Sequence, residues 1–581
     1  MDLISKEEIK RFLKLQDSDR SKIVDFVYNK LKLKDLNEIY SRHSEKESSE
    51  FVTAILADLG IHFEVSPEDL KRIPSKGGFI LLSNHPFGAI DGLIICKSIS
   101  EKRPDFKLMA NFLLQRITPL KDQLFPVNPF ETMKDKQSSV KGVRNALTDV
   151  HEGHPLGIFP AGEVAAFKLS KLNVKEKEWD QIVKFILKCN VPIVPAYISG
   201  TNSPLFHMLG LIHPLLRTAK LPSEIFNKAE KSVHLKIGHP IQVEELKKLG
   251  SVHAISTYLQ LKSNLLSRSL SVDAFYKKPI LGIKKRQVPI IASPQHNLLT
   301  DEIAALPEDT FLMQSGEYQL YLIRSHQAPN LMIELGRLRE LTFREVQEGT
   351  NKEIDLDPYD IYYSHLIIWD QSKEALVGSY RIGKGDEIMA QHGVKGFYLH
   401  SLFKMKKDFR PYLSESVELG RSFIASDYQR KPTTLFLLWK GILLFMDKNP
   451  NYRYLIGPVS MSTSFSKFSK ELVVSFSNQY LQQMELVDLV QPRKKFKLSL
   501  RNEKKVATLL GGIDSDIEKL DKLIQESDRG QRLPILLKKY IGLNAKLISF
   551  NVDPLFNNCL DGFIFLDYHQ VPEKVKEGLR K

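Results

Sequence analysis

Two residues near the start of the chain have the types and spacing needed to activate an alcohol. His85 follows the apolar run GFILL at residues 78–82, and Asp91 comes six positions later. The run has no polar alternation, so it predicts a fully buried strand with His85 on the loop that follows. From that loop the imidazole can take the proton of a hydroxyl group, while the aspartate orients the ring. The alternative is a histidine that serves packing alone.

Two later apolar runs also end in Pro and Gly, as strands of an α/β domain do at their exits. They read GIFPAGE at residues 157–163 and VPIVPAY at residues 191–197. Together with SNHPFGAID at residues 83–91, they resemble the glycerolipid acyltransferase family over roughly residues 50–245. The resemblance implies catalytic roles for His85 and Asp91. It also implies substrate binding by Asn84, Gly88, Phe159, Pro160, Gly162 and Glu163.

The chain departs from the signature of this family in three places. Five residues separate His85 from Asp91 where the family has four, and a bend at Pro86 and Gly88 can absorb the extra one. The second block reads Phe-Pro-Ala-Gly-Glu instead of Phe-Pro-Glu-Gly, so Glu163 does not simply inherit the role of the family's glutamate. The segment FPVNPF at residues 125–130 lacks the arginine that holds a glycerol phosphate. These departures disfavour a phosphorylated glycerol acceptor.

Composition narrows the class of protein. The chain has 581 residues and a formal net charge of +14. That length predicts at least two domains, and the charge suits an anionic membrane surface or an acidic protein partner. Nucleic acid is excluded as a partner because the lysines alternate with acids instead of forming a stripe with stacking aromatics. The three cysteines, Cys96, Cys189 and Cys559, lack metal-ligand spacing, so we expect no metal site and a reducing cytoplasm.

The apolar stretches are too short to predict a membrane span, which needs about 18 residues. Residues 435–446 predict a core helix. Residues 205–217 predict either core packing or a segment in the membrane interface. The charged N-terminus lacks the apolar core of a signal peptide. We therefore expect a cytoplasmic protein that is peripheral on the inner face of the cytoplasmic membrane.

Alternating apolar runs and helical segments predict an α/β fold with two domains. We expect an amphipathic helical segment at residues 1–50, an acyltransferase-like α/β layer domain at 51–285, a linker at 286–309 and a mixed α/β domain at 310–581. In the last of these, strands are predicted at 318–323, 365–370 and 376–382, and a helix at 333–345. The second and third strands should form an antiparallel pair.

The motifs of the second domain resemble a branch of the N-acetyltransferase fold superfamily. They are LRELTF at 338–343, DPYD at 357–360, GSYR at 378–381 and VELGR at 417–421. The branch holds the acyl-homoserine lactone synthases and the N-acyltransferases of bacterial aminolipid synthesis, and the resemblance to the latter is closer. Residues 532–561 also resemble the C-terminal end of these aminolipid enzymes. Matching their motif implicates Arg339, Phe343, Asp357, Asp360, Arg381, Glu418 and Arg421.

Acylation of an amine needs residues of these types. The amine must be neutral to react, but an ammonium group has a pKa of about 10, so a carboxylate must take its proton. Glu418 is the candidate for this catalytic role. Arg381 and Arg421 can hold a substrate carboxylate or the phosphate of a pantetheine arm. The alternative for each of these residues is an ion-pair network that joins neighbouring strands.

The expected acyl donor is an acyl carrier protein. Users of acetyl-CoA in this superfamily wrap the pyrophosphate with a Gly-rich loop at a helix N-terminus, and no such loop is found in the sequence. An acidic carrier also suits a basic chain. We therefore expect no bound cofactor and an acyl-acyl carrier protein, or else acyl-CoA, as the donor.

The two resemblances together are typical of bifunctional aminolipid synthases. In these, the C-terminal domain N-acylates an amino acid with a 3-hydroxyacyl group, and the N-terminal domain esterifies the new 3-hydroxyl. The small amino acid acceptor is ornithine or glycine. The alternative is a lysophospholipid or glycerol-phosphate acyltransferase that carries a C-terminal carrier-docking or regulatory module.

Overall fold

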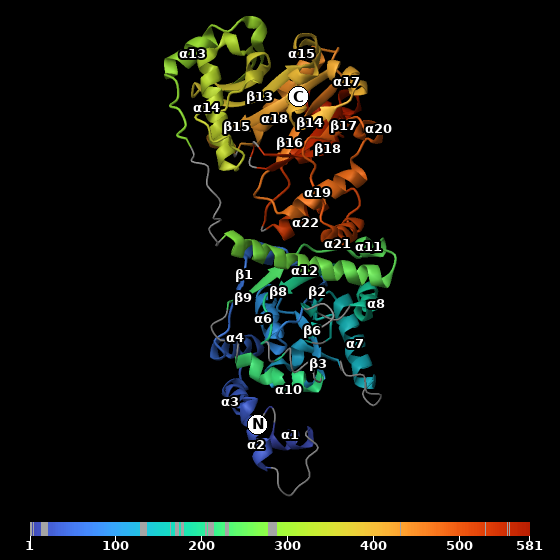
Figure 1. Ribbon diagram of the computed structural model, residues 1–581. Helices are drawn as coiled ribbons and strands as arrows, with labels where there is room; N and C mark the ends of the chain where they lie inside the picture. Colours follow the sequence, from blue (N-terminus) through green and yellow to red (C-terminus); the bar gives the residue numbers. More distant parts are fainter. Residues whose placement is uncertain are drawn as a thin grey trace. The chain divides into compact units, whose positions relative to one another are not determined.

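The computed structural model describes most of the chain, which divides into two compact units (Figure 1). The first unit is Met1–Lys277 with Ala507–Asp514, and the second is the remainder from Lys278 onward. The described residues are 3, 5–12, 21–127, 136–162, 164, 166–168, 173–175, 179–203, 206, 214–226, 232–276, 288–429, 431–528, 530–554, 556 and 558–580.

A seven-stranded sheet forms the centre of the first unit, in the order β1-β9-β8-β2-β5-β3-β4. Its neighbouring strands run parallel except for β8 and β9. A separate pair holds β6 (Ala166–Lys168) and β7 (Asn173–Lys175). The strands of the sheet are β1 (His62–Val65), β2 (Ile80–Ser83), β3 (Lys107–Asn111), β4 (Leu124–Val127), β5 (Leu156–Ile158), β8 (Ile193–Ile198) and β9 (Ser232–Ile237).

Strand β2 confirms the buried strand that the apolar run predicts. Every residue of β2 is buried, because a parallel sheet is covered on both faces and needs a continuous apolar run. Its neighbours are β8 on one side and β5 on the other, both parallel to it. Since parallel strands end at the same edge of a sheet, the loops after β2 and β5 meet there.

Helices pack on this sheet. Helices α3, α4 and α6 share one apolar core with Leu81 of β2, and α12 packs against α8 and β8. Helices α1, α2 and α3 lie in the segment 1–50, for which the sequence predicts helices. The helices of this part are α1 (Lys6–Phe12), α2 (Ser21–Lys30), α3 (Leu33–His43), α4 (Ser48–Asp58), α5 (Pro67–Lys71), α6 (Ala89–Ser100), α7 (Lys136–His151), α8 (Asp180–Cys189), α10 (Pro214–Ile225), α11 (Val243–Lys247) and α12 (Val252–Tyr276).

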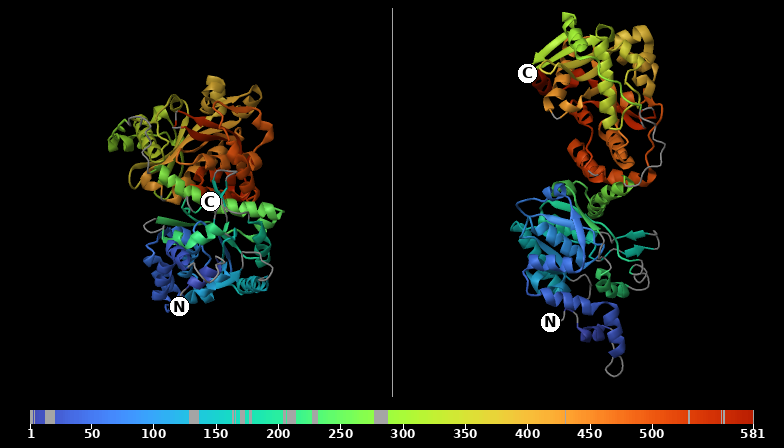
Figure 2. Two further views of the ribbon diagram at one scale, coloured as in Figure 1. Left: turned by 60° about the horizontal axis from the view of Figure 1, so that its bottom comes forward. Right: turned by 90° about the vertical axis from the view of Figure 1, so that its left-hand side faces the viewer.

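The second unit is built on an eight-stranded sheet in the order β10-β11-β12-β13-β15-β16-β19-β18. Its pairs are antiparallel except β15 with β16. In Figure 2 the sheet runs from the yellow-green β10 and β11 to the red β18 and β19. The strands are β10 (Phe311–Ser315), β11 (Tyr318–Arg324), β12 (Ser364–Asp370), β13 (Ala375–Lys384), β15 (Ser416–Ile424), β16 (Tyr454–Met461), β18 (Lys546–Asp553) and β19 (Cys559–Asp567), with β14 (Phe403–Met405) and β17 (Val490–Pro492) paired apart.

Helices α14 and α18 cover opposite faces of this sheet. Leu331 and Leu335 of α14 pack with Ile367, whereas Gly441 of α18 lies against Leu366, the preceding residue of β12. The helices are α13 (His296–Ala304), α14 (Pro329–Glu345), α15 (Gly385–His392), α16 (Leu399–Leu402), α17 (Arg410–Ser414), α18 (Pro432–Lys448), α19 (Lys467–Tyr480), α20 (Met484–Val487), α21 (Leu500–Gly511, assigned to the first unit from Ala507 onward), α22 (Ile517–Ser527), α23 (Ile535–Gly542) and α24 (Glu573–Arg580).

The predicted elements of this unit are present, with one addition. Strands β11, β12 and β13, the antiparallel pair of the last two, and the helix at 333–345 are all confirmed, and α14 begins four residues earlier than the sequence predicts. The predicted core helix at 435–446 is α18. Within the predicted linker, however, α13 forms and docks on α14, because Glu302 accepts hydrogen bonds from the backbone N–H of Asn330 and Leu331.

Among the described residues, no helix combines the length and the apolar character that crossing a bilayer requires. Most of the segment 205–217, for which an interfacial position was one expectation, lies outside the described residues.

Candidate active sites

The first candidate site lies at the carboxyl end of β2. Nδ1 of His85 is 2.9 Å from Oδ2 of Asp91, the third residue of α6. The same oxygen accepts hydrogen bonds from the backbone N–H groups of Phe87 at 2.8 Å and Gly88 at 3.0 Å. Asp91 is fully buried, whereas the His85 side chain is 18% exposed. The carboxylate therefore caps the start of the helix and orients the imidazole at once.

The extra residue between His85 and Asp91 is absorbed by the backbone at Gly88. Its φ of +96° and ψ of −128° lie outside the regions that residues with a Cβ readily adopt. This bend turns the chain into α6 and brings the carboxylate back to the ring. The five-residue spacing is thus compatible with direct contact.

This contact assigns the two ring nitrogens different tasks. A carboxylate beside Nδ1 favours the tautomer with its proton on Nδ1, so Nε2 is the nitrogen that can accept a proton from a hydroxyl group. The ring of Phe159, which follows β5, stacks on the imidazole with a centroid distance of 4.1 Å and an interplanar angle of 20°. Phe159 thus restrains the ring plane.

Residues around this loop hold it in place. Asn84 pairs with the backbone of Ile198 in both directions, at 2.6 Å to its N–H and 2.8 Å to its carbonyl. Asn202 donates to the carbonyl of Pro86 at 3.0 Å. Because both functional ends of the Asn84 amide are used on β8, its geometry favours a positioning role over substrate binding.

The second block of the sequence signature lies beside the first. Pro160 and Gly162 are in the turn after β5, where Gly162 has φ +66° and nothing lies within 4 Å of its would-be Cβ. The predicted substrate-binding residue Glu163 lies outside the described residues.

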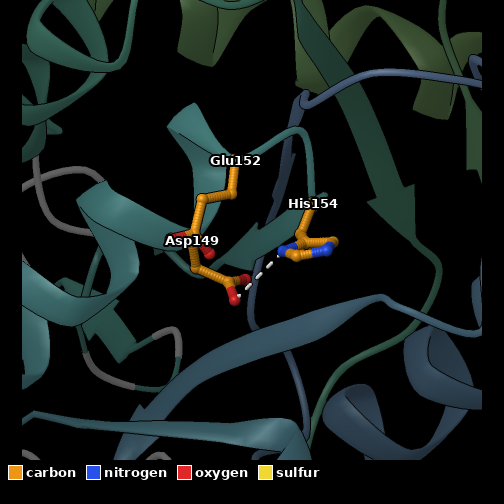
Figure 3. Close-up of side chains that lie close together, drawn as sticks. All are labelled: Asp149, Glu152 and His154. Carbon is orange, nitrogen blue, oxygen red and sulfur yellow. Dashed lines mark ion pairs between the residues drawn. The ribbon is translucent and has the colours of Figure 1, made fainter.

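Three other side chains in this unit bring possible metal ligands together (Figure 3). One ligand atom from each of Asp149, Glu152 and His154 lies within 4.8 Å of the others. Oδ1 of Asp149 is already 2.6 Å from Nζ of Lys107 and 3.2 Å from Nδ1 of His154. The ammonium neutralises the carboxylate, so we interpret the cluster as an ion-pair link between β3 and the end of α7.

The second candidate site opens where β15 and β16 part. These parallel strands are paired only from Ser416 to Glu418 on the β15 side, opposite Tyr454 to Ile456. Beyond that point, residues 419–422 of β15 and 458–460 of β16 line a cavity of about 600 Å³. At the branch point Gly457 lies so close to the carbonyl of Leu419 that a Cβ would be 2.2 Å from it. The cavity wall includes Phe343, Glu348, Tyr398, Arg421, Ser460, Asp553, Phe556 and Asp561.

Arg421 enters this cavity through a distorted strand. Its φ of +49° is rare for a residue with a Cβ, and the pairing of β13 with β15 shifts register between Gly420 and Phe423, the stretch that contains Arg421. The guanidinium lies between the rings of Tyr398 and Phe556, with its carbon 4.9 and 4.6 Å from their centroids. Its nitrogens reach Asp355 at 3.3 Å and Asp357 at 3.4 Å.

The other predicted arginines and aspartates form a buried charge network. Arg339 binds both oxygens of Asp360, at 3.0 and 3.1 Å. Arg381 contacts Asp357 at 2.7 Å and Asp360 at 3.2 Å. Both arginines are 1% exposed, and neither lines the cavity. These contacts favour a structural ion-pair role for Arg339, Arg381 and Asp360, in a network that joins helix α14, the turn before β12 and strand β13. Arg421 connects this network to the cavity.

Glu418 is brought near the cavity but not to its wall. Oε1 accepts a hydrogen bond from the backbone N–H of Leu399 at 2.6 Å, and Oε2 accepts from Tyr398 N–H at 3.0 Å and from the Tyr363 hydroxyl. Burial raises the pKa of Glu418 to about 7. Its contacts fix the chain at Tyr398, whose ring lines the cavity, so the geometry favours a positioning role over contact with substrate.

Several residues of this site were missed from the sequence. Asp355, which binds Arg339 and Arg421, belongs to the alternating acids of DLDPYD, a signal that could have found it. Glu348, on the cavity wall, carries no motif that would mark it before folding, whereas Asp561, also on the wall, ends the segment 532–561 that resembles the aminolipid N-acyltransferases. The predicted Phe343 does line the cavity.

Different protein families match the two halves of the chain. The family described as "Acyltransferase" matches residues 22–274, and that described as "Acetyltransferase (GNAT) domain" matches residues 338–440. With the two sheets described above, these matches define the class: the chain is an acyltransferase in which an N-terminal acyltransferase domain is fused to a C-terminal GNAT-like domain.

Individual relatives refine this class. The chain is 30% identical over 273 residues to the glycine N(alpha)-acyltransferase of Phocaeicola vulgatus, covering 45% of this chain and 82% of the relative. It belongs to the family that includes this enzyme. It is also 24% identical over 247 residues to the lyso-glycine lipid O-acyltransferase of the same organism, covering 40% and 85%. The 1-acyl-sn-glycerophosphate acyltransferase PlsC of Thermotoga maritima covers 41% of the chain at 15% identity and a TM-score of 0.21.

Proposed function

We propose that this chain is a bifunctional acyltransferase of membrane aminolipid synthesis. Its second unit transfers a 3-hydroxyacyl group to the amine of glycine or ornithine, and its first unit esterifies the 3-hydroxyl of the product. The observation that carries the proposal is the presence of two different candidate sites in one chain, His85 with Asp91 and the cavity at Arg421.

The chemistry of the first site supports ester formation. Nε2 of His85 takes the proton of the 3-hydroxyl as its oxygen attacks the thioester carbonyl, and the buried Asp91 stabilises the imidazolium. The proton then passes to the departing thiolate, which leaves as the free thiol. The matched relative that acts on lyso-glycine lipid supports this choice of acceptor.

The shape of the second site supports N-acylation. The gap between β15 and β16 can admit an extended thioester arm, and Arg421 places a guanidinium at its wall, where it can hold a carboxylate. The matched glycine N(alpha)-acyltransferase supports an amino acid as acceptor.

The acyl donor we propose is acyl carrier protein, and the place of action is the cytoplasmic face of the membrane. A net charge of +14 favours both an acidic carrier and an anionic lipid surface. Basic residues near such a surface contribute about 1 kcal/mol each.

Salt or alkaline washing should release the protein, whereas retention until detergent is added would contradict peripheral attachment.

Expression in a host that lacks aminolipids, followed by lipid mass spectrometry, tests the function. A diacylated glycine or ornithine lipid is the expected product, and its mass distinguishes the two amino acids. An unchanged lipid profile with soluble protein present would contradict the proposal. Acylation of lysophospholipid alone would favour a lysophospholipid acyltransferase instead.

A further inference from the structure

The cavity of the second unit has carboxyl groups on its wall to which the sequence motifs give no role. Asp561 lies on β19, opposite Ser460 of β16, and only 3% of it is exposed. Its Oδ1 accepts hydrogen bonds from the Ser460 hydroxyl at 2.6 Å and from the Cys559 thiol at 3.3 Å. Within the described part of the chain no hydrogen bond reaches Oδ2. Hydrogen bonds to Oδ1 thus hold this buried carboxylate in place, and Oδ2 is left to face a ligand in the cavity.

Neighbouring charges tune this carboxyl group. Burial, with the negative charge of Asp553, raises the pKa of Asp561 to about 6, although Arg421 opposes the shift. Burial raises the pKa of Glu348 to about 7, and the charge of Asp561 adds to this shift. A carboxyl group that titrates just below neutral pH is a stronger base than an ordinary aspartate and is still ionised at pH 7.

The same wall carries charge of the opposite sign. Arg421 is close enough to Asp561 to act on its pKa, and both line the one cavity. A guanidinium and a carboxylate facing a shared space match the carboxylate and the ammonium of a free α-amino acid. By contrast, the oxygens of Glu418 are occupied by Tyr363, Tyr398 and Leu399.

We propose that Asp561 binds the ammonium of the amino acid acceptor through Oδ2 and takes its proton, while Arg421 holds the acceptor's carboxylate. This inference rests on the proposed N-acylation by the second unit. Loss of the proton to Asp561 frees the amine lone pair, which forms the C–N bond as the C–S bond of the thioester breaks. A second N–H proton goes to the leaving thiolate, and the proton on Asp561 returns to solvent.

The pH profile of N-acylation tests this role. The purified full chain is assayed with a 3-hydroxyacyl thioester and either glycine or ornithine. The wild-type rate should level off above about pH 7. Asp561→Asn should lose at least about 100-fold at pH 7, and its rate should then rise about tenfold per pH unit, because only the scarce neutral amine reacts. Asp408→Asn, an exposed change in the same unit, is the matched control.

A second variant keeps the test independent of folding defects. Asp553→Asn removes a negative charge that raises the pKa of Asp561, so the midpoint of the pH profile should move to lower pH. A wild-type pH profile in both variants would overturn the role of Asp561. So would an Asp561→Asn profile that is lower at every pH but unchanged in shape. Either result would leave the proposed function of the second unit standing. If the wild-type chain N-acylates neither amino acid, the proposed function of the second unit falls, and this inference falls with it.

Discussion

Asp91 ties the imidazole of His85 to the first turn of α6. One oxygen, Oδ2, serves Nδ1 of His85 at 2.9 Å and the backbone N–H groups of Phe87 and Gly88. The orientation of the ring is therefore coupled to the start of a helix, which is a rigid element. This coupling makes the His85 site sensitive to changes that never touch a substrate.

His85→Ala should stop ester formation and leave N-acyl lyso-lipid to accumulate. General-base assistance contributes about 10²–10⁴-fold, so the O-acylation rate should fall by at least about 100-fold. Asp91→Asn should lose somewhat less, since the imidazole remains. Rates with supplied lyso-lipid give the measurement, and His62→Ala, an exposed histidine of β1, is the control. Normal diacylated product from His85→Ala would remove this residue from the site.

Gly88→Ala should slow O-acylation through backbone strain. A Cβ would have room, with Leu221 at 3.4 Å and Val164 at 3.5 Å, so the cost arises from φ +96° and not from a clash. Such strain costs about 1–3 kcal/mol, and a displaced His85 would lose about tenfold or more in rate. Gly250→Ala, at φ +77° with nothing within 4 Å, matches the positive φ away from the site. Equal rates in both variants would contradict the argument.

The contact of His85 with Asp91 could be predicted from the sequence because the residues that make it are close together in the chain. His85, the buried strand before it and Asp91 lie within fifteen residues, and the bend at Gly88 follows from the residue type. The network of Arg339, Asp360 and Arg381 is different, since it joins a helix, a turn and a strand. Motif matching identifies such residues but not which of them face a cavity.

The strand that carries Glu418 and Arg421 shows why orientation was harder to predict. Alternation assigns side chains to the two faces only while a strand is regular. Arg421, with φ +49°, breaks this alternation at the point where β15 leaves β16. Asp561 reaches the cavity from a strand about 140 positions further along, a contact that only the fold creates.

Glu418→Ala should abolish N-acylation by releasing Tyr398 from its position. The N–H of Leu399 would lose its acceptor, while Tyr363 O–H and the N–H of Tyr398 would keep only longer bonds, to the Gly396 carbonyl at 3.4 Å and the Tyr363 hydroxyl at 3.2 Å. Each unsatisfied buried donor costs about 1–3 kcal/mol, so the unfolding temperature of the second unit should fall. Glu415→Ala, an exposed change nearby, is the control. O-acylation of supplied lyso-lipid should persist, and wild-type N-acylation in Glu418→Ala would contradict the positioning role.

His365 should make the second unit sensitive to acid. The residue is fully buried, and its Nε2 donates to the carbonyl of Asp360 at 3.2 Å. Burial lowers the pKa of His365 from 6.5 to about 4, so the unfolded chain binds one more proton between these pH values. The stabilisation is complete above pH 6.5 and is lost as the pH falls toward 4, a change of about 3 kcal/mol.

Calorimetric unfolding from pH 7 to pH 4 checks this prediction. Carboxyl groups with raised pKa, such as Glu418, have the opposite effect over part of this range, so the quantity to compare is the difference between the wild-type chain and His365→Gln. Gln keeps an N–H that can donate to Asp360 but does not titrate, so the free energy of unfolding of the variant should fall less steeply on acidification. Curves that run parallel from pH 6.5 to pH 4 would mean that His365 takes up its proton equally in the folded and unfolded chain.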